Sequence, residues 1–203
     1  MAEPTRRPIA ARGSALARGL TGWLLRTTIT PNQISLASIG FATLGASALL
    51  AGPGWLWLAA LGIQLRLLCN LLDGMVAVEG GRASPVGALY NEVPDRVADS
   101  LLLVAMGHAA GQPWLGWAAA LAAAMTAYIR ALGGALGLPQ EFRGPMAKQH
   151  RMAVLTLACV LGLLEWALGW PAYALPVAAW VILLGSVLTC GTRLRAIATL
   201  LRA

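Results

Sequence analysis

The stretch that decides the fold runs from Cys69 to Leu101 and reads CNLLDGMVAVEGGRASPVGALYNEVPDRVADSL. Apolar helical patterns flank it on both sides. Five of the eight acidic residues in the 203-residue chain lie within it, and they are Asp73, Glu79, Glu92, Asp95 and Asp99. Placing a charged side chain at membrane depth costs about 2.5–3.5 kcal/mol. These carboxylates therefore predict a functional site carried into or against a membrane.

The composition indicates an all-α integral membrane protein. The chain is 58% hydrophobic and only 11% charged, whereas soluble domains carry about 25% charged residues. Its formal charge of +7 lies mainly in segments that flank apolar runs, which argues against a nucleic-acid partner. The three cysteines, Cys69, Cys159 and Cys190, are far apart in apolar stretches, so neither a disulfide nor a zinc site is indicated.

An amphipathic helix is predicted within the basic segment 1–30. Leu16, Leu20, Trp23 and Leu24 recur at helical spacing and form one apolar stripe among arginines. A basic amphipathic helix beside a membrane segment lies in the headgroup plane. We therefore expect residues 1–30 to form a cytoplasmic, interfacial segment.

Six membrane-spanning helices are predicted in a single domain of residues 1–203, at 33–51, 55–78, 85–110, 114–136, 152–168 and 171–190. Ser84 and Pro85 are typical of a helix N-cap and first turn. The helix that follows is roughly 39 Å long at about 1.5 Å per residue, longer than the ~30 Å hydrocarbon core. Its first two turns, which carry Asn91, Glu92 and Asp95, are therefore expected near one membrane interface.

The basic residues predict the orientation. The loops near Gly52, Gln112 and Gly169 carry no Lys or Arg, whereas both termini and the two other loops carry nearly all of them. Positive charge marks the cytoplasmic side of a membrane protein. We expect a multi-pass protein of the inner (cytoplasmic) membrane with both termini in the cytoplasm.

The polar residues of the central stretch share helix faces. Asn70 and Asp73 are three residues apart, and Asn91, Asp95 and Asp99 are spaced four apart. Residues at these spacings lie on one face, so two antiparallel helices can direct them at one another. Their carboxylate and amide oxygens suit hard cations such as Mg²⁺ or Mn²⁺.

Simpler interpretations exist for the same residues. A carboxylate at a helix end could be solvated, or paired with Arg82 or Arg96. Asp99 could pair with Arg66 or Arg130 and have no other role. The joint spacing of the whole set favours the functional interpretation.

That spacing resembles the signature of the CDP-alcohol phosphotransferase family, D-x2-D-G-x2-A-R-x8-G-x3-D-x3-D. Residues 70–95 read N-x2-D-G-x2-A-V-x8-G-x3-N-x3-D without insertion, and the matching residues are Asp73, Gly74, Ala77, Gly87 and Asp95. The resemblance implies an enzyme of membrane phospholipid biosynthesis. Such an enzyme transfers a phosphoalcohol group from a CDP-alcohol, most often CDP-diacylglycerol, to a small alcohol acceptor and releases CMP. The family is usually dimeric, so a homodimer is also implied.

Carried over by position, the metal ligands are Asn70, Asp73, Asn91 and Asp95, which would hold two divalent ions. Asp95 also matches the aspartate that acts as general base on the acceptor hydroxyl. Two family aspartates are asparagine here and the family arginine is Val78, so the four ligands carry two negative charges in place of four. Metal binding is then weaker, one ion suffices, or Glu79, Glu92 or Asp99 contributes. A register with Asp95 and Asp99 as the last pair breaks the glycine spacing and ranks lower.

The resemblance also implies residues that bind the substrates. Gly74 and Ala77 match positions that accommodate the cytidine end, and Gly87 is a third matching position; all three could instead serve close helix packing. Arg82, four residues after Val78, could replace the missing arginine.

The segment GPMAKQHR contains the only lysine of the chain. In position, its Lys148 and Arg151 resemble the basic stretch that contacts acceptor or lipid phosphates in the family.

Two other hypotheses remain. The asparagines at 70 and 91 and the valine at 78 could mark a catalytically impaired relative that acts as a binding or assembly subunit. A small-ion or metabolite transporter is disfavoured, because the outer halves of the predicted helices are nearly uncharged.

Overall fold

The computed structural model describes residues 13–202, which form α-helices and no strand. The helices are α1 Ala15–Leu24, α2 Pro31–Ala51, α3 Leu56–Glu79, α4 Gly87–Ala109, α5 Pro113–Ala135, α6 Lys148–Leu168 and α7 Ala174–Arg202, with a short 3-10 turn, η2, at Pro53–Trp55. The all-α prediction is confirmed. Arg6, Arg7 and Arg12 of the predicted amphipathic segment lie outside the described residues.

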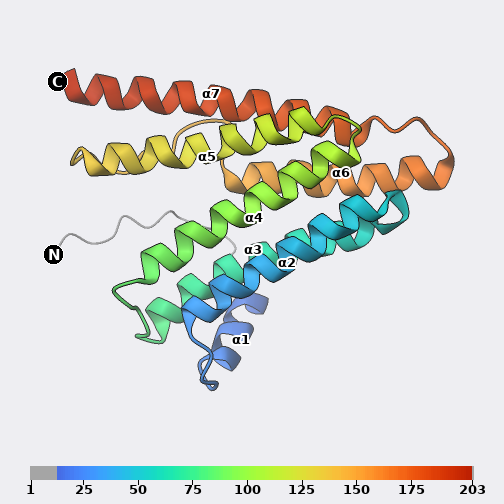
Figure 1. Cartoon of the computed structure of the whole chain (residues 1–203). Helices are drawn as coiled ribbons and strands as arrows, with labels where there is room; N and C mark the ends of the chain where they lie inside the picture. The colour runs from blue at the N-terminus through green and yellow to red at the C-terminus, as the bar shows by residue number, and fades with distance from the viewer. Residues whose placement is uncertain (1–12, 203) are drawn as a thin grey trace.

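The six long helices form one bundle (Figure 1). α2 packs on α3 and α4, and α5 packs on α4 and α7. α6 lies between α3 and α7 and packs on both. The loops before α4 and α6, together with α1 and the end of α7, gather at one end, and the uncharged turns lie at the other. The basic loops therefore share one side of the bundle, as the sequence predicts.

Local sequence determines where the first helices begin. Ser14 caps α1, since its Oγ accepts a hydrogen bond from Ala17 N at 3.2 Å. α2 begins with a capping box, in which Thr30 Oγ1 accepts from Gln33 N at 3.3 Å and Gln33 Oε1 accepts from Thr30 N at 2.9 Å. Pro31 occupies the first turn, where its missing N–H has no partner to lose.

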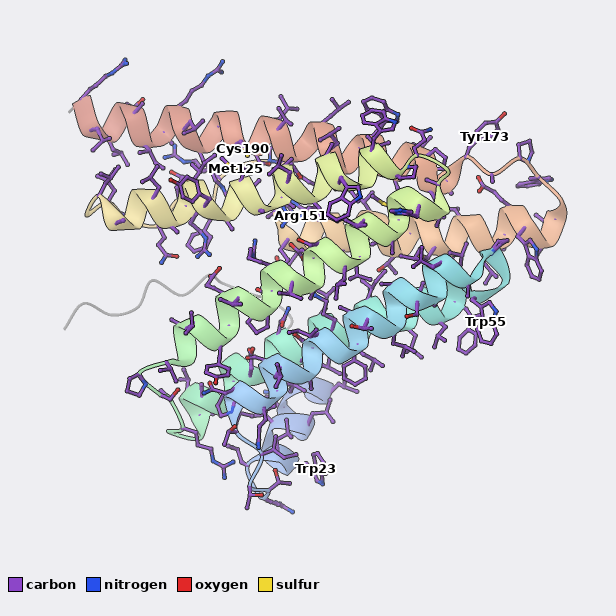
Figure 2. The ribbon with its side chains drawn as sticks, viewed as in Figure 1. Trp23, Trp55, Met125, Arg151, Tyr173 and Cys190 are labelled. Carbon is purple, nitrogen blue, oxygen red and sulfur yellow. The ribbon has the colours of Figure 1, made fainter. Side chains whose placement is uncertain are left out.

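α1 packs on α3. One part of the apolar stripe of α1 is buried by this contact and the rest is exposed. Leu24 is buried in a small cluster with Cys69, Leu72 and Val76, whereas Trp23 is 60% exposed. The labelled Trp23 side chain extends away from the bundle, whereas the labelled Arg151 lies near its middle (Figure 2). The exposed part of the stripe is compatible with a headgroup position for α1, which stays a prediction.

Glycines set the closest helix crossings. A Cβ on Gly62 of α3 would lie 2.8 Å from Gly45 N and from Phe41 O of α2. A Cβ on Gly107 of α4 would lie 2.5 Å from the Cα of Gly116 on α5. Small residues thus allow these backbones to approach, as is common between membrane helices.

The outside of the bundle is apolar on every long helix. Leu50, Leu121, Leu161 and Leu188 are examples of exposed side chains on four different helices. A soluble protein rarely exposes so much apolar surface. Five helices are long and apolar enough to cross a membrane, namely α2, α3, α5, α6 and α7. α4 forms where the third span was predicted but carries too many charges to join that set, so six spans stay a prediction.

Two predicted helix boundaries were wrong. α6 begins at Lys148, four residues before the predicted start at 152, and α7 continues to Arg202, twelve residues past the predicted end at 190. Hydropathy marks the edge of the apolar core, whereas arginine and alanine continue a helix well beyond it. The longer α7 places Arg193 inside the bundle, with only 4% of the residue exposed.

Candidate functional site

The four predicted metal ligands meet in pairs that cross between α3 and α4. Asn70 Nδ2 donates a hydrogen bond to Asp95 Oδ1 at 2.8 Å. Asn91 Nδ2 donates to Asp73 Oδ2 at 3.2 Å. Each helix thus supplies one amide and one carboxylate, at the spacing from which a shared face was predicted.

Asp73 has only neutral partners. Its Oδ2 also accepts a hydrogen bond from Ser35 Oγ of α2 at 2.5 Å. Its Oδ1 is buried and accepts no hydrogen bond from any residue that the structure describes. An unpaired carboxylate oxygen with 97% of its residue covered is costly, and it is therefore an observation that points to a ligand.

Asp95 is surrounded by cations. Lys148 Nζ at the start of α6 donates to Asp95 Oδ2 at 2.5 Å. Arg66 Nη2 lies 3.4 Å from Asp95 Oδ1, and Arg96 Nη2 lies 3.7 Å from Oδ2. Both oxygens of this carboxylate are therefore engaged.

Asp99 belongs to a buried ion-pair group beneath the site. Arg66 Nη2 of α3 donates to Asp99 Oδ1 at 2.6 Å, and Arg151 Nη2 of α6 donates to Asp99 Oδ2 at 2.8 Å. Arg66 is therefore a partner of Asp99, as one of the simpler interpretations predicts. Arg130, the other predicted partner, instead pairs with Glu92 at 2.5 Å.

A polar cavity of about 530 Å³ collects most of the predicted residues. Those that line it are Asn70, Asp73, Gly74, Asn91, Asp95, Lys148 and Arg151. Ala77 and Gly87 are not among its lining residues, so nothing in the geometry supports the predicted contact of Ala77 with cytidine or the substrate-binding role of Gly87.

Arg82 lies away from this cavity. Its Nη1 and Nη2 donate to the carbonyl oxygens of Ile29 and Leu25, each at 3.1 Å. The preceding Gly81 has φ +58°, a conformation that glycine adopts without strain. Arg82 therefore ties the α3–α4 loop to the segment between α1 and α2, and its predicted substrate role has no supporting contact.

Two further cations line the cavity from α5 and α7. Arg130 Nη1 donates to Gln140 Oε1 at 2.7 Å, and its guanidinium lies 5.5 Å from the centre of the Phe142 ring. Arg193 Nη1 donates to Thr126 O at 2.5 Å and its Nε to Arg143 O at 3.0 Å. Sequence reasoning missed Arg193, because a basic residue after an apolar run is typical of a membrane flank.

A local ion pair between Glu141 and Arg143 lies in the loop between α5 and α6. Arg143 Nη2 donates to Glu141 Oε2 at 2.5 Å, and Arg143 N donates to Glu141 Oε1 at 2.9 Å. Hydrogen bonds from Arg143 lower the pKa of the Glu141 carboxyl below its usual value. This pair shapes the loop whose Arg143 carbonyl oxygen accepts from Arg193.

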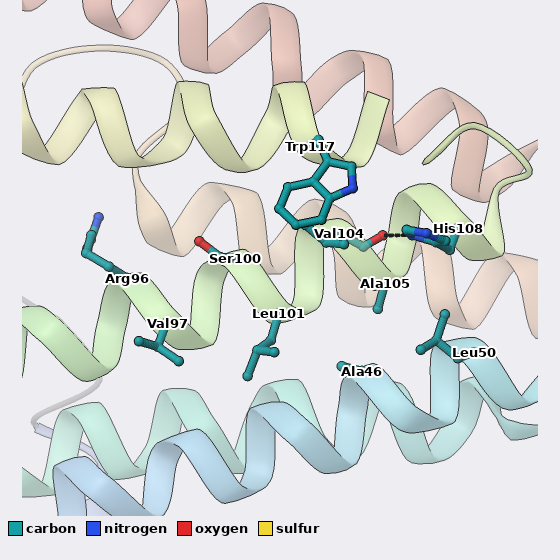
Figure 3. A pocket seen from close by; sticks show the side chains of 10 residues that line it. All are labelled: Ala46, Leu50, Arg96, Val97, Ser100, Leu101, Val104, Ala105, His108 and Trp117. Carbon is teal, nitrogen blue, oxygen red and sulfur yellow. Dashed lines mark hydrogen bonds between the residues drawn. The ribbon is translucent and has the colours of Figure 1, made fainter. Parts of the chain in front are cut away.

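An apolar pocket of about 540 Å³ runs along α4 beside the polar cavity (Figure 3). Arg96 lines one end of it and His108 the other, with Leu101 and Trp117 between them. Arg96 also lines the polar cavity, so the two hollows share one residue. His108 Nδ1 lies 3.0 Å from Val104 O of the same helix.

The model of the CDP-alcohol phosphatidyltransferase family matches residues 28–191, which include the whole motif on α3 and α4. The chain belongs to this family. The resemblance predicted from residues 70–95 is confirmed, and membership identifies the chain as a transferase of membrane phospholipid biosynthesis.

Known relatives agree with this assignment. A bifunctional IPC transferase and DIPP synthase of Rubrobacter xylanophilus is 37% identical over 68% of this chain, which spans only 33% of that protein's length. A phosphatidylinositol phosphate synthase of Mycobacterium marinum is 32% identical over 88% of this chain and 76% of its own length. The crystal structure of a Mycobacterium tuberculosis phosphatidylinositol phosphate synthase with CDP-DAG bound has the same fold. Its TM-score is 0.76 at 22% identity, and the match covers 91% of this chain and 94% of that one.

The family uses Mg²⁺ or Mn²⁺, and the residues present fit one such ion. Asp73 offers an unpaired oxygen, and the two asparagines turn their amide nitrogens toward carboxylates, which leaves their carbonyl oxygens for a ligand. No group of three or more His, Cys, Asp or Glu side chains within residues 13–202 is placed to hold a metal. The reason is that two of the four predicted ligands, at positions 70 and 91, are asparagines. An asparagine supplies an oxygen ligand but no negative charge.

Proposed function

We propose that this chain transfers the phosphatidyl group of CDP-diacylglycerol to a phosphorylated polyol, inositol phosphate above all, with release of CMP. The observation that carries the proposal is the polar cavity, in which Asp73 and Asp95 lie beside Lys148, Arg130 and Arg193. The two carboxylates serve the reacting centre, and the three cations suit a substrate phosphate. Similarity to phosphatidylinositol phosphate synthases supports this choice of acceptor.

The two hollows suit the two ends of a lipid donor. The polar cavity would receive the CDP diphosphate, and the apolar pocket along α4 would receive an acyl chain. Arg96 lines both, so its guanidinium would lie near the phosphate that joins headgroup to lipid. CDP-DAG is bound in the similarly folded mycobacterial enzyme.

Each residue then has a defined part. Asn70, Asp73, Asn91 and Asp95 would form the metal site, where positive charge would offset the charge of the diphosphate oxygens and the departing CMP. Gly74, which lines the cavity, would allow the cytidine end to approach. The same role for Ala77, and a substrate-binding role for Gly87, rest on the motif alone.

The chemistry is a phosphoryl substitution. An acceptor hydroxyl oxygen would attack the phosphorus that bears the diacylglycerol, and the bond from that phosphorus to the oxygen of CMP would break, with its electron pair leaving on CMP. Asp95 would accept the hydroxyl proton. Arg130 and Arg193 would bind the acceptor phosphate. Lys148 and Arg151 line the cavity from α6.

The membrane arrangement belongs to the same proposal. α4 would be the sixth span, with its polar first turns at the interface, and the chain would form one membrane domain with both termini in the cytoplasm. The cavity would then open at the inner leaflet, where lipid and soluble acceptor meet. A homodimer is the assembly that the family implies.

The deciding experiment is CMP release by purified protein. CDP-diacylglycerol would be supplied with Mg²⁺ or Mn²⁺ and a pool of inositol phosphate, glycerol phosphate, inositol and serine, with Asp95→Asn as the blank. We expect metal-dependent release that is lost in the variant, and splitting the pool should identify inositol phosphate. Release that persists in Asp95→Asn, or none with any acceptor from folded protein, would contradict the proposal.

A catalytically impaired relative is the alternative, favoured by one observation. Lys148 and Asn70 engage both oxygens of Asp95, the residue assigned as general base. Asn70→Asp combined with Asn91→Asp separates the two hypotheses. Turnover gained by this double variant over a silent parent protein would support impairment, and an active parent would exclude it.

A further inference from the structure

Cations already pair with two of the carboxylates of the site, Asp95 and Asp99. Asp95 and Asp99 each contact a cation at 2.5–2.8 Å, and these cations are Lys148, Arg66 and Arg151. Arg96, Arg130 and Arg193 also line the cavity, where Glu92 is a fourth carboxylate, so six cations face four carboxylates before any metal binds. Further positive charge is favourable only where one carboxylate still lacks a cation.

Asp73 is that carboxylate. It forms no ion pair within the described part of the chain, and its Oδ1 has no hydrogen-bond partner there. The side chains that donate to its Oδ2, Ser35 and Asn91, are neutral. At Asp95 the Lys148 ammonium is already bound. In the family pattern of four aspartates, this carboxylate would help to hold a second ion.

We infer that this chain is a one-metal enzyme, in which a single divalent cation binds at Asp73 and the Lys148 ammonium takes the place of a second ion at Asp95. The site already holds more cations than carboxylates, and a second divalent ion would add positive charge where Lys148 and Arg66 already contact Asp95. Burying uncompensated charge is unfavourable. The inference deepens the proposed function and rests on it, because the single ion is the one that would hold the donor diphosphate.

The test counts bound ions in the protein itself. Purified full-length protein in detergent would be titrated with Mn²⁺, with free and bound ion measured by electron paramagnetic resonance. We expect one Mn²⁺ per chain, with the spectrum of an isolated ion. Two ions per chain with a spin-coupled spectrum would overturn the inference, and so would the absence of saturable binding.

Variants at Lys148 test its part separately. Lys148→Met should bind the single Mn²⁺ about tenfold more tightly, because a neighbouring positive charge has been removed. Lys148→Arg keeps that charge and should match the wild-type affinity within about twofold. Equal affinities for Lys148→Met and Lys148→Arg would overturn the role given to the ammonium.

Restoring the family charges should restore the second ion. Asn70→Asp, Asn91→Asp and Lys148→Met combined should bind two Mn²⁺ with a coupled spectrum. A folded triple variant that still binds one ion contradicts the inference, and the wild-type count decides it if the triple variant does not fold.

The same preparations would be assayed for CMP release. Release with two coupled ions overturns the one-metal inference and leaves the proposed function standing. One bound ion without CMP release would support the one-metal inference and contradict the proposed function.

Discussion

Arg66 Nη2 of α3 lies 2.6 Å from Asp99 Oδ1 of α4, with both side chains at most 3% exposed. Arg151 of α6 takes the other oxygen at 2.8 Å. One carboxylate thus joins three helices directly beneath the polar cavity. Arg66 also reaches Asp95 at 3.4 Å, so the group positions that residue as well.

Asp99→Asn should destabilise the protein strongly. The change leaves two buried guanidinium groups without their shared counter-ion, and breaking a buried pair in this way costs about 3–5 kcal/mol. The measurement is the midpoint of thermal unfolding in detergent. Glu79→Gln is the matched control, because Glu79 is an exposed carboxylate at the end of α3. Equal midpoints for the two variants would show that the group contributes little to stability.

Ser35→Ala should weaken metal binding while the fold is retained. Ser35 Oγ donates to Asp73 Oδ2 at 2.5 Å and so orients the carboxylate whose other oxygen has no partner. Loss of a group that orients a metal ligand lowers metal affinity about 10–100-fold. The readout is Mn²⁺ affinity measured by titration.

Ser38→Ala is the control for Ser35→Ala. Ser38 is also buried on α2, but its hydroxyl donates to the Ser35 carbonyl oxygen and contacts no carboxylate. An affinity loss of the same size in both variants would mean that the effect comes from α2 packing and not from Asp73.

The residues on α3 and α4 could be predicted because helical geometry links spacing to direction. Positions three or four apart share a face, so Asn70 with Asp73, and Asn91 with Asp95, had to point together. The residues that complete the site could not be predicted in this way. Ser35 is 38 residues from its partner Asp73 and Arg193 is 67 residues from Thr126, and periodicity does not say which helices become neighbours.

Arg82 shows where spacing is a poor guide. It follows Val78 by one helical turn in sequence, but α3 ends at Glu79 and a glycine with positive φ redirects the chain before Arg82. Its side chain then meets backbone carbonyl groups near α1. The rule that residues four apart share a face applies only while the helix continues.

Gly107→Ala should lower stability by roughly 1–3 kcal/mol, the usual cost of overpacking. The new Cβ would lie 2.5 Å from backbone atoms of Gly116, which cannot move without separating α4 from α5. Gly191→Ala on α7 is the control, since no atom lies within 4 Å of its added Cβ. Alanine there should stabilise by up to ~1 kcal/mol through helix propensity. Thermal unfolding of both variants checks the opposite signs.

Arg193→Gln should impair use of the phosphorylated acceptor specifically. Arg193 is buried at the cavity wall, where it joins α7 to α5 and to the loop before α6. Hydrogen bonds to charged groups contribute about 1.5–3 kcal/mol, so the acceptor KM should rise about 10–100-fold while the KM for CDP-diacylglycerol stays within about twofold. Arg195→Gln, at an exposed position two residues later on the same helix, should leave both KM values unchanged. A parallel rise in both KM values for Arg193→Gln would indicate that this arginine supports the bundle and does not hold the acceptor phosphate.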